Sequence, residues 1–130
     1  MSVLRGLWLY GPVLGYCLFI FTLSNQPSLP STPGGDLVAH FAAYTLMGGL
    51  FFRAIALSSS WTRTKVFSWA AILGGLYGLS DEFHQSFIPG RFATIEDCIA
   101  DALGSIFGAI CGLILYRRAQ DGAWRFLFGR

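Results

Sequence analysis

The sequence has few charged residues and no paired cysteines. Asp, Glu, Lys and Arg make up 12% of its 130 residues, about half of what a soluble domain usually carries. The three cysteines, Cys17, Cys98 and Cys111, are isolated, which argues against a disulfide framework and a thiolate metal site. A net charge of +2 is too small a basic excess to indicate nucleic-acid binding. Because 54% of the residues are hydrophobic, the composition favours a membrane protein.

Four apolar stretches have about the length, roughly 20 residues, that a helix needs to cross a bilayer. They cover about residues 4–23, 37–57, 66–86 and 95–116, but the third is apolar only from Val66 to Leu79 and continues with polar residues. Pro12 interrupts the first stretch and predicts a kink that neighbouring helices must accommodate. No small-residue cleavage pattern follows this stretch, so we interpret it as a retained span rather than a signal peptide. The sequence predicts one domain, residues 1–130, that is all-α: an integral membrane bundle of four transmembrane helices.

The basic residues predict how this bundle is oriented. Short loops rich in Lys and Arg remain on the cytoplasmic side of a membrane. Eight of the nine basic residues fall near the N-terminus, around the connection between the second and third stretches, or after the fourth stretch. Arg91 alone falls on the other side. We therefore expect both termini in the cytoplasm.

The acidic residues gather on the opposite, extracytoplasmic side. Six of the seven acidic residues lie there: Asp36, Asp81, Glu82, Glu96, Asp97 and Asp101. Both histidines lie on the same side. The positive-inside rule concerns Lys and Arg, so it does not explain this segregation. An ionised Asp at the bilayer centre is unfavourable by about 2.5–3.5 kcal/mol. Neighbouring acids inside a membrane should therefore be paired, protonated or bound to a cation, which favours a functional site.

Helical spacing places these polar residues on three stripes near the outer helix ends, because the members of each stripe lie three or four residues apart. The stripes are Asp36, His40 and Tyr44; Asp81 or Glu82, with Gln85; and Asp97 and Asp101. Gly48, Gly78 and Gly104 extend the stripes inward, where small residues allow close helix packing. Asp81 lies about 22 Å along its helix from Val66, so it should lie within the outer bilayer. One shared, partly sunken pocket is predicted.

The residue types in this pocket suggest candidate roles. Candidate catalytic residues, as general acids and bases, are His40, Asp81 and Glu82. Candidate substrate-binding residues are Asp36, Tyr44, Gln85, Arg91, Asp97 and Asp101. Arg91 follows the Pro89-Gly90 turn and is either a salt-bridge partner or an anion clamp for a phosphate headgroup.

Simpler structural roles are open for three of these residues. Asp36 could be the N-cap of the second helix. Asp97 could form a capping box with Thr94, and His40 could be a hydrogen-bonded interior histidine. A divalent metal would find ligand types among His40, Asp36, Asp81, Glu82 and Asp97. Because the chain has no HExxH or similarly compact signature, we assign no metal-ligating residue and expect no cofactor.

A set of residues at characteristic spacings resembles a known family pattern over about residues 24–112. The set comprises Ser24, Pro27, Asp36, His40, Phe41, Tyr44, Gly48, Asp81, Glu82, Gln85, Phe87, Pro89, Gly90, Arg91, Asp97, Ala100, Gly104 and Gly108. The chain resembles the VanZ-like family of small bacterial membrane proteins. It departs from the expected pattern at Leu37, where we expect Lys, and at Asp101, where we expect Asn. Both departures make the pocket more negative.

The resemblance implies a multi-pass protein of the bacterial cytoplasmic membrane, in a family named for an association with reduced teicoplanin susceptibility. We expect its extracytoplasmic pocket to act on a lipid or a lipid-linked cell-envelope component, as an enzyme or modifying factor. A non-catalytic protein that binds a membrane lipid, a lipid-linked precursor or a glycopeptide is the alternative. Proton-coupled transport is a third hypothesis, disfavoured because the inner halves of the helices carry few polar groups.

The orientation makes a testable prediction at Cys98, which lies close to the outer end of the fourth stretch. A membrane-impermeant thiol reagent applied to intact cells is expected to label Cys98, with Cys17, deeper in the first stretch, probed in parallel. Mass spectrometry of the purified protein measures the modification. Labelling of Cys98 only after lysis would contradict the orientation.

Overall fold

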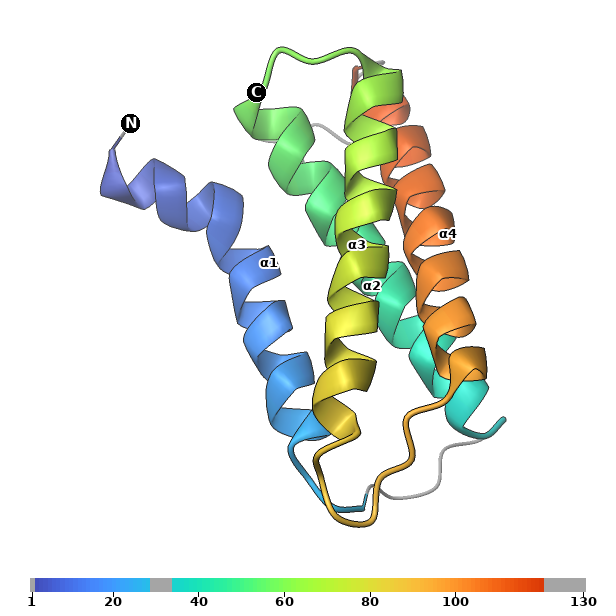
Figure 1. Cartoon of the computed structure of the whole chain (residues 1–130). Helices are drawn as coiled ribbons and strands as arrows, with labels where there is room; N and C mark the ends of the chain where they lie inside the picture. The colour runs from blue at the N-terminus through green and yellow to red at the C-terminus, as the bar shows by residue number, and fades with distance from the viewer. Residues whose placement is uncertain (1, 29–33, 121–130) are drawn as a thin grey trace.

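The computed structural model describes residues 2–28 and 34–120, and these residues form four helices (Figure 1). The helices are α1 (Val3–Ser24), α2 (Asp36–Ser58), α3 (Arg63–Gln85) and α4 (Ile95–Gln120). The described residues contain no strand. The predicted all-α bundle of four helices is confirmed.

The helix boundaries follow from local hydrogen bonding. In both α1 and α3, the residue before the helix accepts a hydrogen bond from a backbone N–H three residues later. The hydroxyl of Ser2 accepts from Arg5 at 3.3 Å, and that of Thr62 accepts from Lys65 at 3.4 Å. Such caps satisfy donors that have no partner within the helix. Gly35 precedes α2 with a φ of 80°, a conformation that is readily available only to glycine.

Three of the four helices are long and apolar enough to cross a membrane: α1, α2 with the preceding Gly35, and α4. α3 is as long as α2 at 23 residues, but polar side chains near its C-terminal end lower its apolarity. Three of these, Asp81, Glu82 and Gln85, are buried against neighbouring helices. Polar residues in membrane helices usually face the bundle interior in this way.

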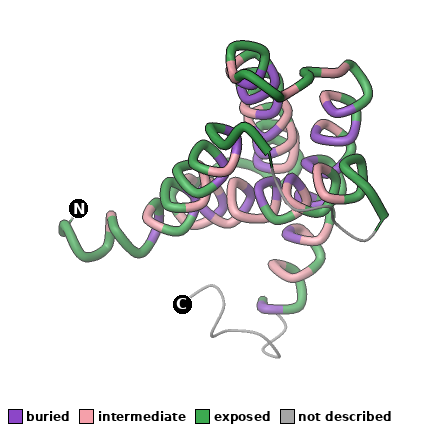
Figure 2. Tube along the Cα trace, turned by 90° about the horizontal axis from the view of Figure 1, so that it is seen from below, coloured by how far each residue is buried: buried purple, intermediate pink, exposed green. Residues whose placement is uncertain are grey.

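The helices α2, α3 and α4 pack together, and α1 lies beside them along its C-terminal part (Figure 1). The end of α1, the start of α2, the end of α3 and the start of α4 meet at one end of the bundle. In Figure 2 the buried residues lie mainly between the helices, and exposed residues cover the outside. Many of the exposed side chains are large and hydrophobic, as a lipid-facing surface requires.

Pro12 lies inside α1, whose N-terminal part bends away from the bundle (Figure 1). Proline has no N–H, so the carbonyl of Trp8, four residues earlier, lacks its helical hydrogen bond. Arg53 of α2 replaces that donor. Its Nη1 donates to the Trp8 carbonyl at 3.1 Å and to the Leu9 carbonyl at 3.5 Å, and its guanidinium lies 4.2 Å from the Trp8 ring centroid. The predicted accommodation of Pro12 by a neighbouring helix is confirmed.

The backbones of α2 and α4 approach each other closely at glycines. A Cβ atom at Gly108 would overlap the carbonyl oxygen of Thr45, and one at Gly104 would overlap the carbonyl oxygen of Phe41. Interfaces of this kind are typical of membrane helices, where van der Waals contact replaces the hydrophobic effect as the driving force. The expected packing role of these small residues is confirmed.

Gly108→Ala is expected to destabilise the bundle by about 1–3 kcal/mol, because the added methyl group collides with backbone that cannot rotate away. The matched control is Gly75→Ala in α3, where a Cβ would have no neighbour within 4 Å. This control should be neutral or stabilising, since Ala is the better helix former. Thermal unfolding of both purified variants in detergent measures the difference. Equal unfolding midpoints would contradict the close approach of α2 and α4.

Arg53→Ala is expected to lower stability by about 1–3 kcal/mol, because it leaves the Trp8 carbonyl without a donor. The loss should shrink in a Pro12→Ala background, where the helix itself can bond that carbonyl. A double-mutant cycle followed by thermal unfolding measures this coupling. Arg5→Ala, at an exposed position of α1, controls for removal of a basic residue. Equal losses in both backgrounds would rule out the proposed replacement.

Candidate functional site

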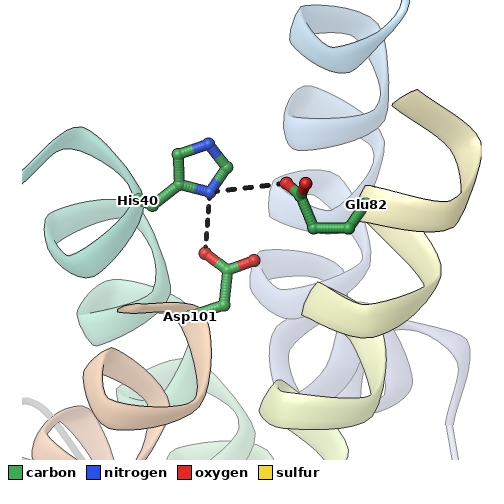
Figure 3. Close-up of side chains that lie close together, drawn as sticks. All are labelled: His40, Glu82 and Asp101. Carbon is green, nitrogen blue, oxygen red and sulfur yellow. Dashed lines mark hydrogen bonds and ion pairs between the residues drawn. The ribbon is translucent and has the colours of Figure 1, made fainter. Parts of the chain in front are cut away.

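Three helices bring His40, Glu82 and Asp101 together at one end of the bundle (Figure 3). Nδ1 of His40 lies 2.9 Å from Oδ1 of Asp101 and 3.8 Å from Oε1 of Glu82. The Asp101 side chain is fully buried, and those of Glu82 and His40 are 4% and 14% exposed. We call these residues the His40 cluster. The ring Nε2 of His40 points away from both carboxylates (Figure 3).

Helix packing positions Asp101 in this cluster. A Cβ atom at Gly78 of α3 would overlap the side chain of Asp101, so only glycine at this position leaves room for the carboxylate. Gly104, one turn further along α4, permits the contact with α2 at the Phe41 carbonyl, next to His40 in the sequence. The small residues that pack the bundle thus also bring the three side chains of the His40 cluster together.

The carboxylates of the His40 cluster are only partly satisfied. Oε2 of Glu82 accepts a hydrogen bond from the backbone N–H of Thr94 at 3.2 Å. Oε1 of Glu82 and Oδ2 of Asp101 are buried without a hydrogen-bond partner among the described residues. His40 is the only basic side chain that forms an ion pair with either carboxylate in the described part of the chain. Buried charge of this kind requires a proton or a cation nearby.

A second polar group connects α3 to the turn that follows it. Arg91 donates from Nε to Oε1 of Gln85 at 3.0 Å and also from Nη2 to the same oxygen. The amide nitrogen of Gln85 donates to Oδ2 of Asp81 at 3.0 Å and to the hydroxyl of Ser24 at 3.4 Å. Within residues 2–28 and 34–120, Arg91 forms no ion pair, so the salt-bridge interpretation is wrong for this part of the chain. Two of the five guanidinium N–H groups bond to Gln85, and the other three have no hydrogen bond to a described residue.

Two cavities adjoin these groups and share His40, Gln85 and Arg91. The larger, of about 350 Å³, is called the headgroup cavity below. Its walls include Pro27, Asp36, His40, Gln85, Arg91, Thr94 and Asp97. The smaller, of about 180 Å³, is mostly apolar and contains Tyr44 and Asp81.

A third hollow, the lateral groove, lies on the outside of the bundle between α3 and α4. It measures about 680 Å³, and its walls are mainly apolar: Leu76, Leu79, Phe83, Ala93 and Ile95, with Glu82 and Thr94 among the polar residues. Leu79 and Phe83 are more than half exposed, so the groove opens towards the surroundings of the helices. In a membrane those surroundings are lipid chains.

The structure distributes the nine candidate residues over these features. Asp36, Arg91 and Asp97 line the headgroup cavity, and Tyr44 and Asp81 line the smaller one, with Gln85 between them. Asp81 and Glu82 are adjacent in the sequence but contact different neighbours, because successive helical side chains point about 100° apart. Asp81 therefore does not join the other two candidate acid–base residues.

The simpler structural roles are resolved for three residues. Gly35 is the N-cap of α2, so the interpretation of Asp36 as an N-cap is wrong, and Asp36 is the first helical residue. Only half of the predicted capping box forms, because the Asp97 N–H donates to Oγ1 of Thr94 at 3.1 Å, whereas the Thr94 N–H donates to Glu82. The Asp97 carboxylate accepts instead from the Thr94 hydroxyl, at 2.8 Å. His40 is hydrogen-bonded to Asp101, as expected of an interior histidine, and it also lines the headgroup cavity.

Sequence reasoning missed one contributor to the site and one buried polar residue next to the site along α4. The backbone N–H of Thr94 supports Glu82, although Thr94 was considered only as a capping residue. Ser105 is fully buried one turn after Asp101, against the glycines of α2 and α3. Its four-residue spacing from Asp101 places it on the same helix face, which is the signal that could have identified it.

The fold and the site define a multi-pass helical membrane protein with a buried histidine–carboxylate cluster at one end of its bundle. A family model described as VanZ/LLP1 matches residues 8–116. The chain therefore belongs to the VanZ/LLP1 family, as the sequence resemblance predicted.

The chain is also similar to a protein of fission yeast. The "Uncharacterized protein C11E3.10" of the fission yeast Schizosaccharomyces pombe is 28% identical over 100 residues, which cover 76% of this chain and 59% of that protein. The chain thus matches a little more than half the length of this relative. No solved structure matches the chain.

Proposed function

We propose that the protein binds a phosphate-containing lipid or lipid-linked envelope component and acts on its headgroup. The polar end of this ligand occupies the headgroup cavity, and its apolar chain lies in the lateral groove. One observation carries the proposal: Glu82 lines the lateral groove and also lies 3.8 Å from His40, which lines the headgroup cavity. The junction between the polar and apolar parts of an amphiphile is expected at this residue.

The charges of the headgroup cavity favour this class of ligand. A guanidinium binds phosphate through paired, geometrically matched hydrogen bonds, and Gln85 holds that of Arg91 in place at the cavity wall. Asp36 and Asp97 line the same cavity and suit an amine or hydroxyl group elsewhere on the headgroup. Because the cavity carries both positive and negative side chains, it favours a headgroup that has hydrogen-bond donors or a positive charge in addition to its phosphate.

The His40 cluster supplies groups for proton transfer to the bound headgroup. A carboxylate on one ring nitrogen orients an imidazole and leaves the other nitrogen for the substrate. Asp101 occupies Nδ1 of His40, so Nε2 is the atom available for a general acid or base. Sites that protect such groups from bulk water strengthen their electrostatic effect.

The proposed location is the cytoplasmic membrane of a bacterium, with the site on the extracytoplasmic face. The basic residues predict this orientation, and the headgroup cavity would then face the outer leaflet. The fission-yeast relative favours a lipid that bacteria and fungi share over a ligand confined to the bacterial wall. A role in teicoplanin susceptibility would follow if the altered lipid changes the envelope that the glycopeptide reaches.

Expression of the chain in a bacterial host is expected to change the composition of its lipid or lipid-linked precursor pools, measured by lipid mass spectrometry. Glu82→Gln should abolish the change while the purified protein still retains co-purified lipid. Arg91→Ala should reduce lipid retention by about tenfold or more, because a charge-assisted hydrogen bond contributes about 1.5–3 kcal/mol.

The matched control is Glu96→Gln, because Glu96 is an exposed carboxylate in the first turn of α4 and lines neither the headgroup cavity nor the smaller cavity beside it. This variant should behave as wild type. Retained lipid together with unchanged pools would support the non-catalytic binding alternative. If neither lipid retention nor the pools respond to Arg91→Ala and Glu82→Gln, the proposal is wrong.

A further inference from the structure

The three groups of the His40 cluster also have the composition and spacing of a metal site. One nitrogen of His40 and one oxygen each of Glu82 and Asp101 lie within 4.8 Å of one another. Two ligands at about 2.1 Å from one tetrahedral ion are about 3.4 Å apart. The observed separations of 2.9 Å and 3.8 Å from Nδ1 of His40 lie on either side of this value.

The two carboxylates of the His40 cluster are buried and only partly hydrogen-bonded. Glu82 is 3% exposed and Asp101 is fully buried, yet one oxygen of each has no hydrogen-bond partner among the described residues. The unpartnered Oε1 of Glu82 is the oxygen that points at His40 (Figure 3). A cation between these atoms would satisfy both oxygens at once.

The surroundings supply the other features of a protein metal site. The backbone N–H of Thr94 holds the second oxygen of Glu82 at 3.2 Å, which is the kind of outer hydrogen bond that orients a ligating carboxylate. His40 also lines the headgroup cavity, which gives an ion an entry path and leaves room for a further ligand. Three protein ligands with one open position are characteristic of catalytic rather than structural zinc sites.

We infer that His40, Glu82 and Asp101 bind one divalent transition-metal ion through Nδ1, Oε1 and a carboxylate oxygen of Asp101. One imidazole with two carboxylates suits Zn²⁺ and also Mn²⁺. The ion would replace the proton between His40 and Asp101, leaving Nε2 of His40 unchanged. The inference concerns the same residues as the proposed function, but it does not require that a lipid bind.

The test uses the full-length protein in detergent, freed of any affinity tag and stripped of metal with a chelator. Equilibrium dialysis against Zn²⁺, and separately against Mn²⁺, followed by elemental analysis, is expected to find one ion per chain for at least one of the two metals. His40→Ala and Glu82→Gln should each weaken binding by at least tenfold. The matched controls, His84→Ala and Glu96→Gln, should retain full stoichiometry. His84 stacks on Phe21, with ring centroids 4.8 Å apart, and lies outside the cluster.

A second measurement guards against variants that fail to fold. The wild-type protein should show a higher unfolding temperature in the presence of the bound metal, and the control variants should show the same shift. Absence of binding by wild-type protein at 100-fold molar excess of both metals would overturn the inference. Equal loss of binding in His40→Ala and His84→Ala would also overturn it. Because metal binding is measured independently of lipid binding, failure here leaves the proposed function standing, and unchanged lipid pools leave the metal site standing.

Discussion

Buried carboxylates are the constraint on which the rest of this structure depends. Four of them, from Asp81, Glu82, Asp97 and Asp101, are enclosed at one end of a bundle whose outer surface carries many large apolar side chains. Taking such groups out of water is unfavourable unless each finds a donor or a positive charge. Gln85, Thr94 and His40 supply those partners through hydrogen bonds, and the end of the bundle is organised around them.

The rest of the bundle holds these partners in position. Glycines let α2 and α4 come into backbone contact, and this approach places the imidazole of His40 beside Asp101. Contact between helices also satisfies a polar group at the other end of the bundle. There Arg53 donates a hydrogen bond to the Trp8 carbonyl, which Pro12 leaves without its helical donor. At both ends, a polar group inside the membrane is satisfied by a different helix. Polar pairing therefore fixes helix positions that apolar packing alone would leave less specific.

The headgroup cavity and the lateral groove differ in polarity. The headgroup cavity carries charges of both signs, the lateral groove is mainly apolar, and Glu82 connects them. A ligand that satisfies both regions is an amphiphile, which is also the material that surrounds a membrane protein. Among residues 2–28 and 34–120, two buried oxygens at the junction have no hydrogen-bond partner, so this is the point at which a proton, a metal ion or a reacting headgroup has the largest electrostatic effect.

By itself the sequence determined the four helices, the gathering of acids and histidines at one side, and the family. These follow from long apolar runs and from spacing by three or four residues, which are properties of single segments. Only the tertiary structure decided that Asp101 rather than Asp81 joins His40 and Glu82, and that Arg91 bonds to Gln85 rather than to an acid. Adjacent residues such as Asp81 and Glu82 differ by a rotation about one helix axis, and their partners depend on how neighbouring helices are rotated and how closely they approach.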